Sequence, residues 1–242
     1  KNINEILNKI KNKNFYTYGI NKNSNFQILN VSQKINLSSF DIKINIPANK
    51  KIIKKIKIPL IGLHNIKNVT SAVAVAFSIG ISEKIIKKGL IKFKGVQRRF
   101  SFLFKHNKTI FIDDYAHHPT EISAVLEGVK KVYGKKEIIC VFQPHRISRV
   151  KNLKLEFSRC FKKADTVLLC PIYKANENLK LGFSYSSFAK LIIKNSKVKL
   201  ININNDLELK KFLKQTAYGE KIYIGMGAGS ISNWMRSLKN NI

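Results

Sequence analysis

The order of apolar and polar positions divides the chain into two parts with different rhythms. In residues 15–47, three short segments alternate apolar with polar side chains, and this period of two predicts half-buried strands. Residues 65–79 carry apolar side chains every three or four positions, which predicts a helix that Gly80 ends. Residues 82–93 predict a second helix, with Ser82 as its capping residue. The first part is therefore expected to combine a small sheet with helices.

Beyond residue 100, apolar runs alternate with amphipathic segments. Residues 137–142 and 165–170 are apolar over several consecutive positions, which is typical of strands buried on both faces. The segments 119–134 and 151–164 each predict one amphipathic helix. This alternation of strand and helix predicts a mostly parallel α/β sheet with helices covering both of its faces.

The change of rhythm places a domain boundary close to Gly95. We therefore expect one domain over residues 1–94 and a second over residues 95–242. The hydrophobic content of 44% supports a sizeable core, which excludes a wholly disordered chain. The longest mostly apolar run, residues 69–81, is shorter than the ~20 residues that span a bilayer. No export leader is visible, so we expect a protein that is neither secreted nor inserted in a membrane.

The chain has three cysteines, and none of them has the CxxC spacing of a metal or redox motif. Two lie in apolar runs and one lies in a helical pattern. We expect free, mostly buried thiols in a reducing compartment rather than disulfides or metal ligands. These residues are Cys140, Cys160 and Cys170.

The net charge is strongly positive, because 45 basic residues face 14 acidic ones and give +31. Clustered lysine and arginine would neutralise phosphates, so a basic, non-enzymatic nucleic-acid-binding module is one hypothesis. The lysines, however, are spread over the predicted helices and loops, with no aromatic residues arranged for base stacking. This distribution favours an ordinary solvated surface, and the nucleic-acid module stays as the alternative.

Arginine and histidine are rare in this chain, and their positions are informative. Lysine outnumbers arginine 39 to 6, so an arginine is expected where its planar, bidentate guanidinium is needed. Four of the six arginines fall in two short segments, QRRF at 97–100 and HRISR at 145–149. Four of the five histidines lie beside segments that resemble turns. We take these positions as the first candidates for chemistry.

These candidates follow the predicted strands directly. Because ligands of open parallel sheets bind outside the carboxyl ends of the strands, the residues at those ends are expected to form one cleft. Alternatives remain open at each position: an aspartate can cap backbone donors, a histidine can bond a carbonyl, and an arginine pair can be a weak surface ion pair. The residues concerned are Asp113, Asp114, Tyr115, His117, His118, His145, Arg146, Arg149, Gly225, Gly227 and Gly229.

The helix that follows the first of these strands has two features of a helix start. Pro119 suits the first helical position, and Glu121 complements the positive end of the helix dipole. We therefore expect the helix to begin at Pro119.

Several motifs together resemble the Mur ligase family. They are GLHNIKNVTSAVAVA, GVQRRF, FIDDYAHHPTEI, VFQPHRISRVKNL and GMGAGSI, in the family's order over residues 60–231. DDYAHHPTE combined with FQPHRxxR is the most specific pair. It favours the member that adds L-alanine to UDP-N-acetylmuramate over the member that recycles the intact murein tripeptide, which stays as an alternative.

The resemblance implies a fold and a reaction. The fold would be part of a central ATP-binding domain followed by a Rossmann-like, mostly parallel α/β carboxyl-terminal domain that binds the amino acid. The reaction would use ATP and Mg²⁺ to convert the muramyl carboxylate into an acyl phosphate, which the amine of L-alanine attacks. This activity belongs to peptidoglycan precursor synthesis in the bacterial cytoplasm.

The resemblance also implies roles for residues that match the family's motifs. An amide can both donate to and accept from a purine edge, and arginine supplies a permanent cation for phosphate. The expected cofactor-binding residues, on the ATP side, are His64, Asn65, Asn68 and Arg98. The expected catalytic residues are Arg99, which is the better candidate for the ATP phosphates, Asp114 near the ribose, and His117 near the incoming amine. The expected substrate-binding residues are Tyr115, His145, Arg146 and Arg149.

Some elements of the family are not found in this sequence. No GxxxxGK[ST] phosphate loop or GTHGKT-like segment is present, and the family's YxAGE turn is YKANE, with Asn176 in place of glycine. The chain begins with Lys1 rather than methionine. We therefore expect a carboxyl-terminal fragment that lacks the UDP-binding domain and the Mg²⁺ ligands, has the missing segment as a possible partner chain, and is inactive alone.

Overall fold

The computed structural model describes residues 15–35, 37–47, 49–93, 95–177 and 184–240. Its contacts divide the chain into two compact units. The first unit comprises Lys1–Ser32, Ser38–Ile58 and Asn65–Phe93. The second unit comprises Gln33–Leu37, Pro59–His64 and Lys94–Ile242.

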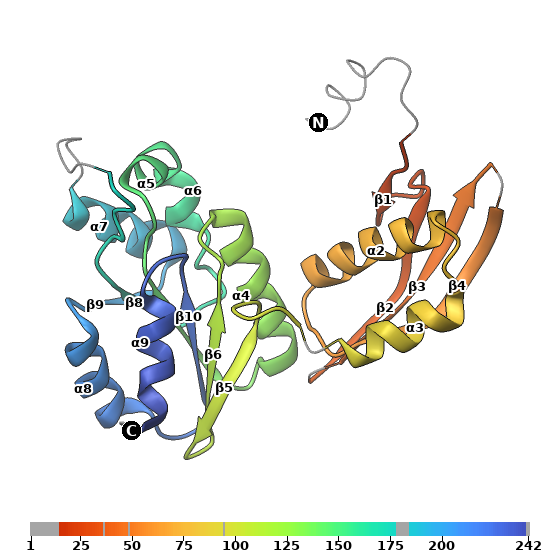
Figure 1. The fold of residues 1–242 in the computed structure, drawn as a ribbon. Coiled ribbons are helices and arrows are strands. Elements are labelled where there is room, and N and C mark those ends of the chain that lie inside the picture. The colour runs from red at the N-terminus through yellow and green to blue at the C-terminus, as the bar shows by residue number, and fades with distance from the viewer. Residues whose placement is uncertain (1–14, 36, 48, 94, 178–183, 241–242) are drawn as a thin grey trace. The chain divides into compact units, whose positions relative to one another are not determined.

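The first unit contains a four-stranded sheet with helices packed on it (Figure 1). The strands lie in chain order, β1 is parallel to β2, and β3 is antiparallel to β4. Phe77 of the first helix contacts both β2, through the ring of Phe26 at 6.3 Å, and β4, through the ammonium group of Lys51 at 4.8 Å. The elements are β1 (Tyr18–Gly19), β2 (Phe26–Lys34), β3 (Leu37–Ile46), β4 (Asn49–Ile58), α2 (Leu63–Ser78) and α3 (Glu83–Lys92).

Strand β4 was not predicted from the sequence, because a β-bulge interrupts its alternation. The register with β3 shifts between Phe40 and Ile42, and Lys55 opposite this point has a φ of +55°. The carboxylate of Asp41 accepts a hydrogen bond from the backbone N–H of Lys55 at 2.7 Å, which satisfies a donor that the bulge removes from the ladder. The extra residue moves the later isoleucines out of the simple period of two.

The second unit contains a six-stranded sheet in the order β5-β6-β10-β7-β8-β9. Only β5 is antiparallel to its neighbour; the other pairings are parallel, which confirms the predicted mostly parallel α/β sheet. The last strand in the sequence, β10, therefore lies in the middle of the sheet, between β6 and β7. The strands are β5 (Ser101–His106), β6 (Thr109–Asp114), β7 (Glu137–Phe142), β8 (Thr166–Leu169), β9 (Lys199–Asn202) and β10 (Lys221–Met226).

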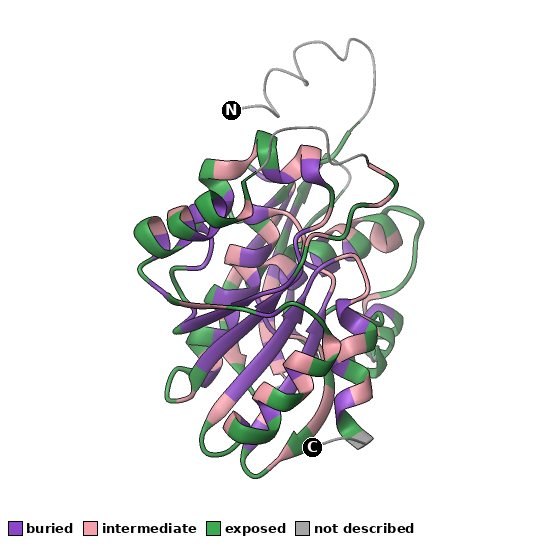
Figure 2. Ribbon diagram, turned by 90° about the vertical axis from the view of Figure 1, so that its left-hand side faces the viewer, coloured by how far each residue is buried: buried purple, intermediate pink, exposed green. Residues whose placement is uncertain are grey.

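Helices cover both faces of this sheet, as the apolar runs predicted. Buried side chains of α4, α6 and α7 form one core layer, and those of α8 and α9 form the other. The four inner strands of the sheet are buried over most of their length, whereas each helix has an exposed side (Figure 2). The helices are α4 (Pro119–Tyr133), α5 (Ile147–Asn152), α6 (Lys154–Arg159), α7 (Tyr185–Ser196), α8 (Asp206–Thr216), α9 (Ile231–Ser237) and the 3₁₀ turn η1 (Leu238–Asn240).

The single helix predicted over 151–164 was wrong. The structure has two short helices, α5 and α6, and Leu153 between them has non-helical angles of φ −113° and ψ 28°. The amphipathic pattern runs through the break, so the pattern alone did not reveal it. After the break, α6 packs its Phe157 into the core.

Two other expectations are confirmed. Helix α4 begins at Pro119, as the proline at its first position indicated. The three cysteines are free and buried, and burial raises the pKa of each thiol. Within the described residues, no helix is both long and apolar enough to cross a membrane.

The aromatic core predicts a measurable loss of stability. Phe157 is fully buried and packs against the rings of Phe142 at 5.7 Å and Phe188 at 6.2 Å. Phe157→Ala should lower the free energy of unfolding by about 3–5 kcal/mol, because it removes buried contacts and leaves a cavity. Leu155→Ala on the same helix is the control, since Leu155 is 55% exposed, and it should change stability by less than about 0.5 kcal/mol. Equal losses in chemical denaturation would contradict the described packing of α6.

Candidate active site

Loops from three neighbouring strands meet at the carboxyl edge of the second sheet. Met226 at the end of β10 pairs with Asp114 at the end of β6 and with Phe142 at the end of β7. The three strands therefore end level with each other. The loops that begin at Tyr115, Gln143 and Gly227 start side by side.

The two adjacent aspartates lie on opposite faces of β6. Asp113 points to the α9 side, where its carboxylate accepts a hydrogen bond from Ser232 Oγ at 2.5 Å and lies 3.4 Å from Arg236 Nη2. Asp114 points to the other side, where it accepts backbone N–H bonds from Ala116 and Phe100, each at 2.7 Å. Asp113 thus anchors α9, and Asp114 holds the two segments that carry the candidate site residues.

Burial has a strong effect on Asp114, which is only 2% exposed. Desolvation raises the pKa of its carboxyl to about 6, although the two backbone N–H bonds and the nearby Arg99 act in the opposite direction. The bonds it accepts are the capping interactions that the sequence left open as an alternative. A contact between Asp114 and a nucleotide ribose stays a prediction.

Tyr115 lies between two arginines and a histidine. Its backbone N–H donates to the carbonyl of Arg98 at 2.6 Å. The guanidinium carbons of Arg98 and Arg99 lie 4.6 and 5.5 Å from the centre of its ring, within cation–π range. The ring of His117 meets it edge to face at 5.1 Å. Two residues expected on the ATP side and two expected on the substrate side are therefore brought together.

The two adjacent histidines have different surroundings. His118 caps α4: its Nδ1 accepts from the N–H of Thr120 at 3.3 Å, and Glu121 accepts from the N–H groups of His117 and His118 at 3.1 and 3.3 Å. His117 turns toward the candidate site, where its Nδ1 lies 2.9 Å from the carbonyl of Tyr115. A carbonyl only accepts, so Nδ1 carries a hydrogen in this contact, and in the neutral ring Nε2 is then the acceptor.

His145 extends the cluster from the loop after β7. Its ring lies 5.8 Å from that of His117 and stacks on Tyr173 at 5.5 Å, with an angle of 8° between the planes. Its Nδ1 lies 3.3 Å from Arg149 Nη1, on the first full turn of α5. We name Tyr115, His117, His145, Tyr173 and Arg149 the histidine cluster.

The surroundings of His145 favour its neutral form. Partial burial, followed by the charges of Arg149, His117 and Arg146, lowers the pKa of its imidazole. A neutral ring can accept the hydrogen bond from Arg149 at Nδ1. Arg146 is exposed beside the cluster, with a backbone φ of +65°, and its N–H donates to the carbonyl of Tyr173 at 2.9 Å.

The loop after β10 forms a glycine turn over residues 227–229. The side chain of Gln143 holds one side of it, by accepting from the N–H of Ile231 and donating to Ser230 Oγ, both at 3.0 Å. Gly227 has a φ of +152°, and a Cβ there would lie 2.7 Å from the carbonyl oxygen of Gln143. Gly225 has a different role, because a Cβ on it would lie 2.4 Å from Met235 Cγ of α9.

The residues of the HNxxN motif fall in both units. His64 belongs to the second unit and is mostly buried; burial and then Arg99 lower the pKa of its imidazole, and its Nδ1 has no hydrogen-bond partner among the described residues. Asn65, which is buried, and Asn68, which is exposed, lie on the first turns of α2 in the first unit. Within the second unit, His64 is close enough to Arg99 for the guanidinium charge to act on its imidazole.

Three contributors to this site were not singled out as site residues from the sequence. Tyr173 follows the buried strand β8, and its place at a strand end was a usable signal. Gln143 directly follows the apolar run 137–142, so it too lies at a strand end. Glu177 accepts from the N–H of Ser148 at 3.0 Å and from its Oγ at 2.5 Å, and these bonds lower the pKa of its carboxyl. These two hydrogen bonds join the loop after β8 to the start of α5.

The asparagine in the YKANE turn has a simple conformational explanation. Asn176 has a φ of +67°, in the left-handed region that glycine occupies freely and that asparagine adopts more readily than most residues. The turn therefore keeps a conformation compatible with the family's glycine.

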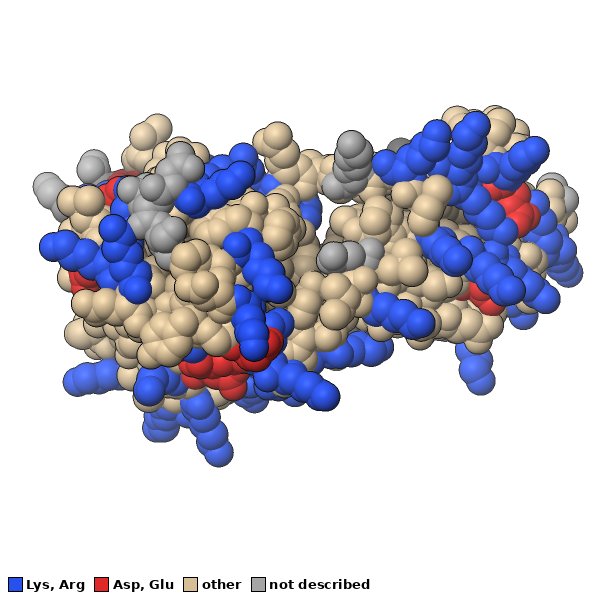
Figure 3. Space-filling model, turned by 90° about the horizontal axis from the view of Figure 1, so that it is seen from below, with Lys and Arg blue, Asp and Glu red and all other residues tan. Residues whose placement is uncertain are grey.

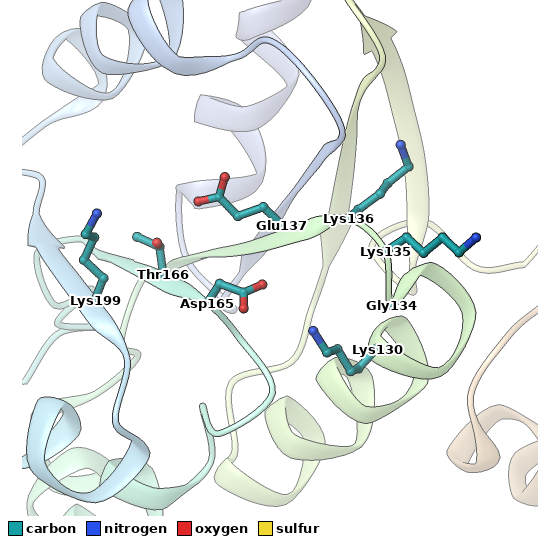
Figure 4. Close-up of a pocket in the computed structure, with 8 residues that line it drawn as sticks. All are labelled: Lys130, Gly134, Lys135, Lys136, Glu137, Asp165, Thr166 and Lys199. Atoms are coloured by element: carbon teal, nitrogen blue, oxygen red, sulfur yellow. The ribbon is translucent and has the colours of Figure 1, made fainter.

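The opposite edge of the same sheet has an open hollow of another kind. It lies at the amino ends of β7, β8 and β9, and half of its lining residues are lysines, which come from α4, from the turn after α4 and from β9 (Figure 4). Its acids are engaged: Glu137 lies 3.6 Å from Lys221 Nζ, and Asp165 accepts from the N–H of Ile138 at 2.8 Å. Because ligands of such sheets bind at the carboxyl ends, the histidine cluster is the better candidate.

The surface charge and the metal-binding residues give no competing site. On the face seen in Figure 3, lysine and arginine side chains are spread over many elements, with only a few acidic side chains between them. Among the described residues, no group of three or more histidine, cysteine or acidic side chains could hold a metal ion. Binding of ATP or Mg²⁺ therefore stays a prediction.

The fold and the site define a class first: an α/β protein whose arginine, histidine and tyrosine side chains meet at the carboxyl edge of a parallel sheet. Comparison with known families gives the particular family. Residues 1–76 match the Mur ligase middle domain, and residues 98–229 match the domain described as Mur ligase, glutamate ligase domain. The chain belongs to the Mur ligase family.

Individual relatives agree with this assignment. A UDP-N-acetylmuramate–L-alanine ligase of Pelagibacter ubique is 59% identical over 239 residues, which are 98% of this chain and 52% of the relative. One of Rickettsia bellii is 38% identical over 247 residues, with shares of 98% and 51%. The chain thus spans about half the length of these relatives.

A solved structure supports the fold. The UDP-N-acetylmuramate–alanine ligase of Thermotoga maritima superposes with a TM-score of 0.74 at 24% identity, over 93% of this chain and 47% of that one.

The arginine beside His145 predicts a shift in titration. Arg149→Ala removes a positive neighbour and a hydrogen-bond donor, and both favour the neutral ring. The pKa of His145 should therefore rise toward its ordinary value, as measured by NMR of the imidazole Cε1–H. Arg159→Ala, on the exposed side of α6, is the matched control and should leave this titration in place. An unchanged His145 titration in Arg149→Ala would contradict the described contact.

The buried acid predicts a dependence of stability on pH. The pKa of Asp114 is about 6 in the folded protein, above its ordinary value of 3.8, so the folded state binds the proton more tightly. Its contribution to stability is present below pH 4 and is lost as the pH rises through 6. Chemical denaturation of the wild type and of Asp114→Asn across pH 4–7 isolates this contribution. The free energy of unfolding of the wild type, relative to that of Asp114→Asn, should decrease as the pH rises. A relative value that stays constant across this range would contradict the raised pKa of Asp114.

Proposed function

We propose that this chain forms the middle- and carboxyl-terminal-domain part of an ATP-dependent ligase that joins L-alanine to UDP-N-acetylmuramate. The observation that carries the proposal is the histidine cluster with Arg99 beside it. It gathers rare cationic and imidazole groups at one sheet edge in a chain whose common cation is lysine. The relatives are named for this reaction, and the chemistry of the cluster fits it.

The reaction needs cations for two kinds of anion. A carboxylate is activated as an acyl phosphate, so negative charge builds up on phosphate and carboxyl oxygens. Arg99 is suited to the phosphate, because its side chain is 49% exposed and its ion pair with Glu121 is long, at 4.0 Å. Arg146 and Arg149 are suited to the carboxylate, which a guanidinium can bind with two parallel hydrogen bonds.

The amine must lose a proton before it attacks. An amino acid arrives as an ammonium ion, and a nearby neutral imidazole can accept its proton. His117 fits this role, because its Nδ1 faces the carbonyl of Tyr115 and its Nε2 is left as the acceptor. Tyr115 and His145 border His117 on both sides and fix the direction of its ring.

The remaining residues are likewise divided between the nucleotide side and the substrate side. His64 is placed near Arg99 and is proposed for the nucleotide side, with Asn65 and Asn68 as its partners in the motif. We propose the domains as residues 1–94 and 95–242, and assign no Mg²⁺ ligand to the described residues. Asp114 is proposed to act by holding the loops of Arg99 and His117 in place.

The proposal can be tested in a chimera. These 242 residues would replace the matching 52% of the Pelagibacter ubique ligase, to which they are 59% identical. ATP-dependent phosphate release should require UDP-N-acetylmuramate and L-alanine, and the murein tripeptide should not replace the alanine. His117→Ala and Arg149→Ala should each lower the rate by roughly a hundredfold or more, because each removes a group that acts on the reacting atoms.

Two controls accompany the chimera. Arg159→Ala should keep the chimera's rate, and the 242-residue chain alone should release no phosphate, since it has no phosphate loop. Preference for the tripeptide would instead support the recycling ligase. Full activity of both site variants would refute the assigned roles.

A further inference from the structure

Arg98 is half-buried by its own protein, whereas its neighbour Arg99 is exposed. Its Nη2 donates to the carbonyl oxygens of Gly227 at 2.7 Å and of Gly229 at 3.3 Å. Its guanidinium stacks on Tyr115 at 4.6 Å, and its backbone has a φ of +61°. The Nε of Arg98 is buried and has no partner among the described residues. Its hydrogen-bonding edge is thus turned to the glycine turn and away from solvent.

The contacts of Arg98 close a ring of side chains and loops. From Arg98 the ring passes through the stacked Tyr115 to His117 at 5.1 Å and on to His145 at 5.8 Å. His145 stacks on Tyr173 at 5.5 Å. Tyr173 in turn lies against Gly229, where a Cβ would be only 2.5 Å from its Cγ. Gly229 then returns to Arg98 through its carbonyl.

We propose that Arg98 is a positioning residue, which locks the glycine turn and the Tyr115 ring in place around the histidine pair and leaves Arg99 as the cation that meets the ligand. This proposal differs from the role expected for Arg98 from the sequence, which was to bind ATP. The inference deepens the proposed function, because it divides the QRRF pair into one internal and one ligand-facing arginine.

The geometry explains why lysine could not replace Arg98. A guanidinium is flat, so it can stack on a ring while its edge bonds to carbonyls in the same plane. An ammonium group is a compact point charge without a stacking face. Arg98→Lys keeps the charge and loses the arrangement. The conservative variant therefore separates positioning from simple charge.

The spectroscopic test uses the 242-residue chain. NMR signals of the imidazole Cε1–H groups would be recorded for Arg98→Lys, Arg98→Ala, Arg99→Lys and Arg99→Ala. Both Arg98 variants should shift the signals of His117 and His145, because the closed set of contacts that runs through Arg98 is broken. Arg99→Ala should mainly raise the pKa of His64, which Arg99 lowers, and Arg99→Lys should keep it. If Arg98→Ala fails to fold, Arg98→Lys still decides the question.

The kinetic test uses the chimera described above. Arg98→Lys should lower kcat by about tenfold to a hundredfold with little change in the KM for ATP, because misplaced loops impair the chemical step. Arg99→Ala should raise the KM for ATP. Histidine signals of Arg98→Lys that match the wild type, or a raised ATP KM without a loss of kcat, would overturn the proposal.

The two tests also separate this inference from the proposed function. A chimera that ignores L-alanine would reject the proposed function, whereas the histidine signals would still decide the role of Arg98.

Discussion

The position of β10 is the constraint on which the site depends. The last strand of the chain inserts between β6 and β7, and parallel hydrogen bonding sets Met226 level with Asp114 on one side and with Phe142 on the other. Parallel ladders allow no slip here, because a shift by one residue would turn every buried side chain to the opposite face. The loops with Tyr115, His145 and the glycine turn are therefore neighbours, although more than 100 residues separate the first from the last.

The fixed carboxyl edge of the sheet determines how deeply each charged group is buried and which charges lie beside it. Asp114 is buried, so its carboxyl holds its proton up to about pH 6, yet it has two backbone N–H groups to bond. Partial burial, and after it the charges of Arg149, His117 and Arg146, lowers the pKa of His145. In a chain with 39 lysines, the arginines of this edge occupy positions where a flat donor is needed. The common lysines cover the solvated surface.

Much of the fold could be predicted from the sequence, because a buried parallel strand and an amphipathic helix each leave a periodic pattern. The predictions failed where the backbone departs from regular geometry. The bulge opposite Asp41 hid β4, and the break at Leu153 divided a helix whose amphipathic pattern is continuous. Tyr173 was missed as a site residue because its role depends on stacking against His145, which is 28 positions away in the sequence.

The sequence by itself determined the alternation of strand and helix, the family, and the short segments in which the chemistry is concentrated. The tertiary structure decided which member of each adjacent pair faces the site. Asp114 rather than Asp113 bonds to the backbone beside Tyr115, His117 rather than His118 meets the rings of Tyr115 and His145, and Arg99 is more exposed than Arg98. Neighbours along a chain point in different directions, and their contacts decide which direction each one takes. Helix α9 holds Asp113, the first turn of α4 holds His118, and the glycine turn holds Arg98.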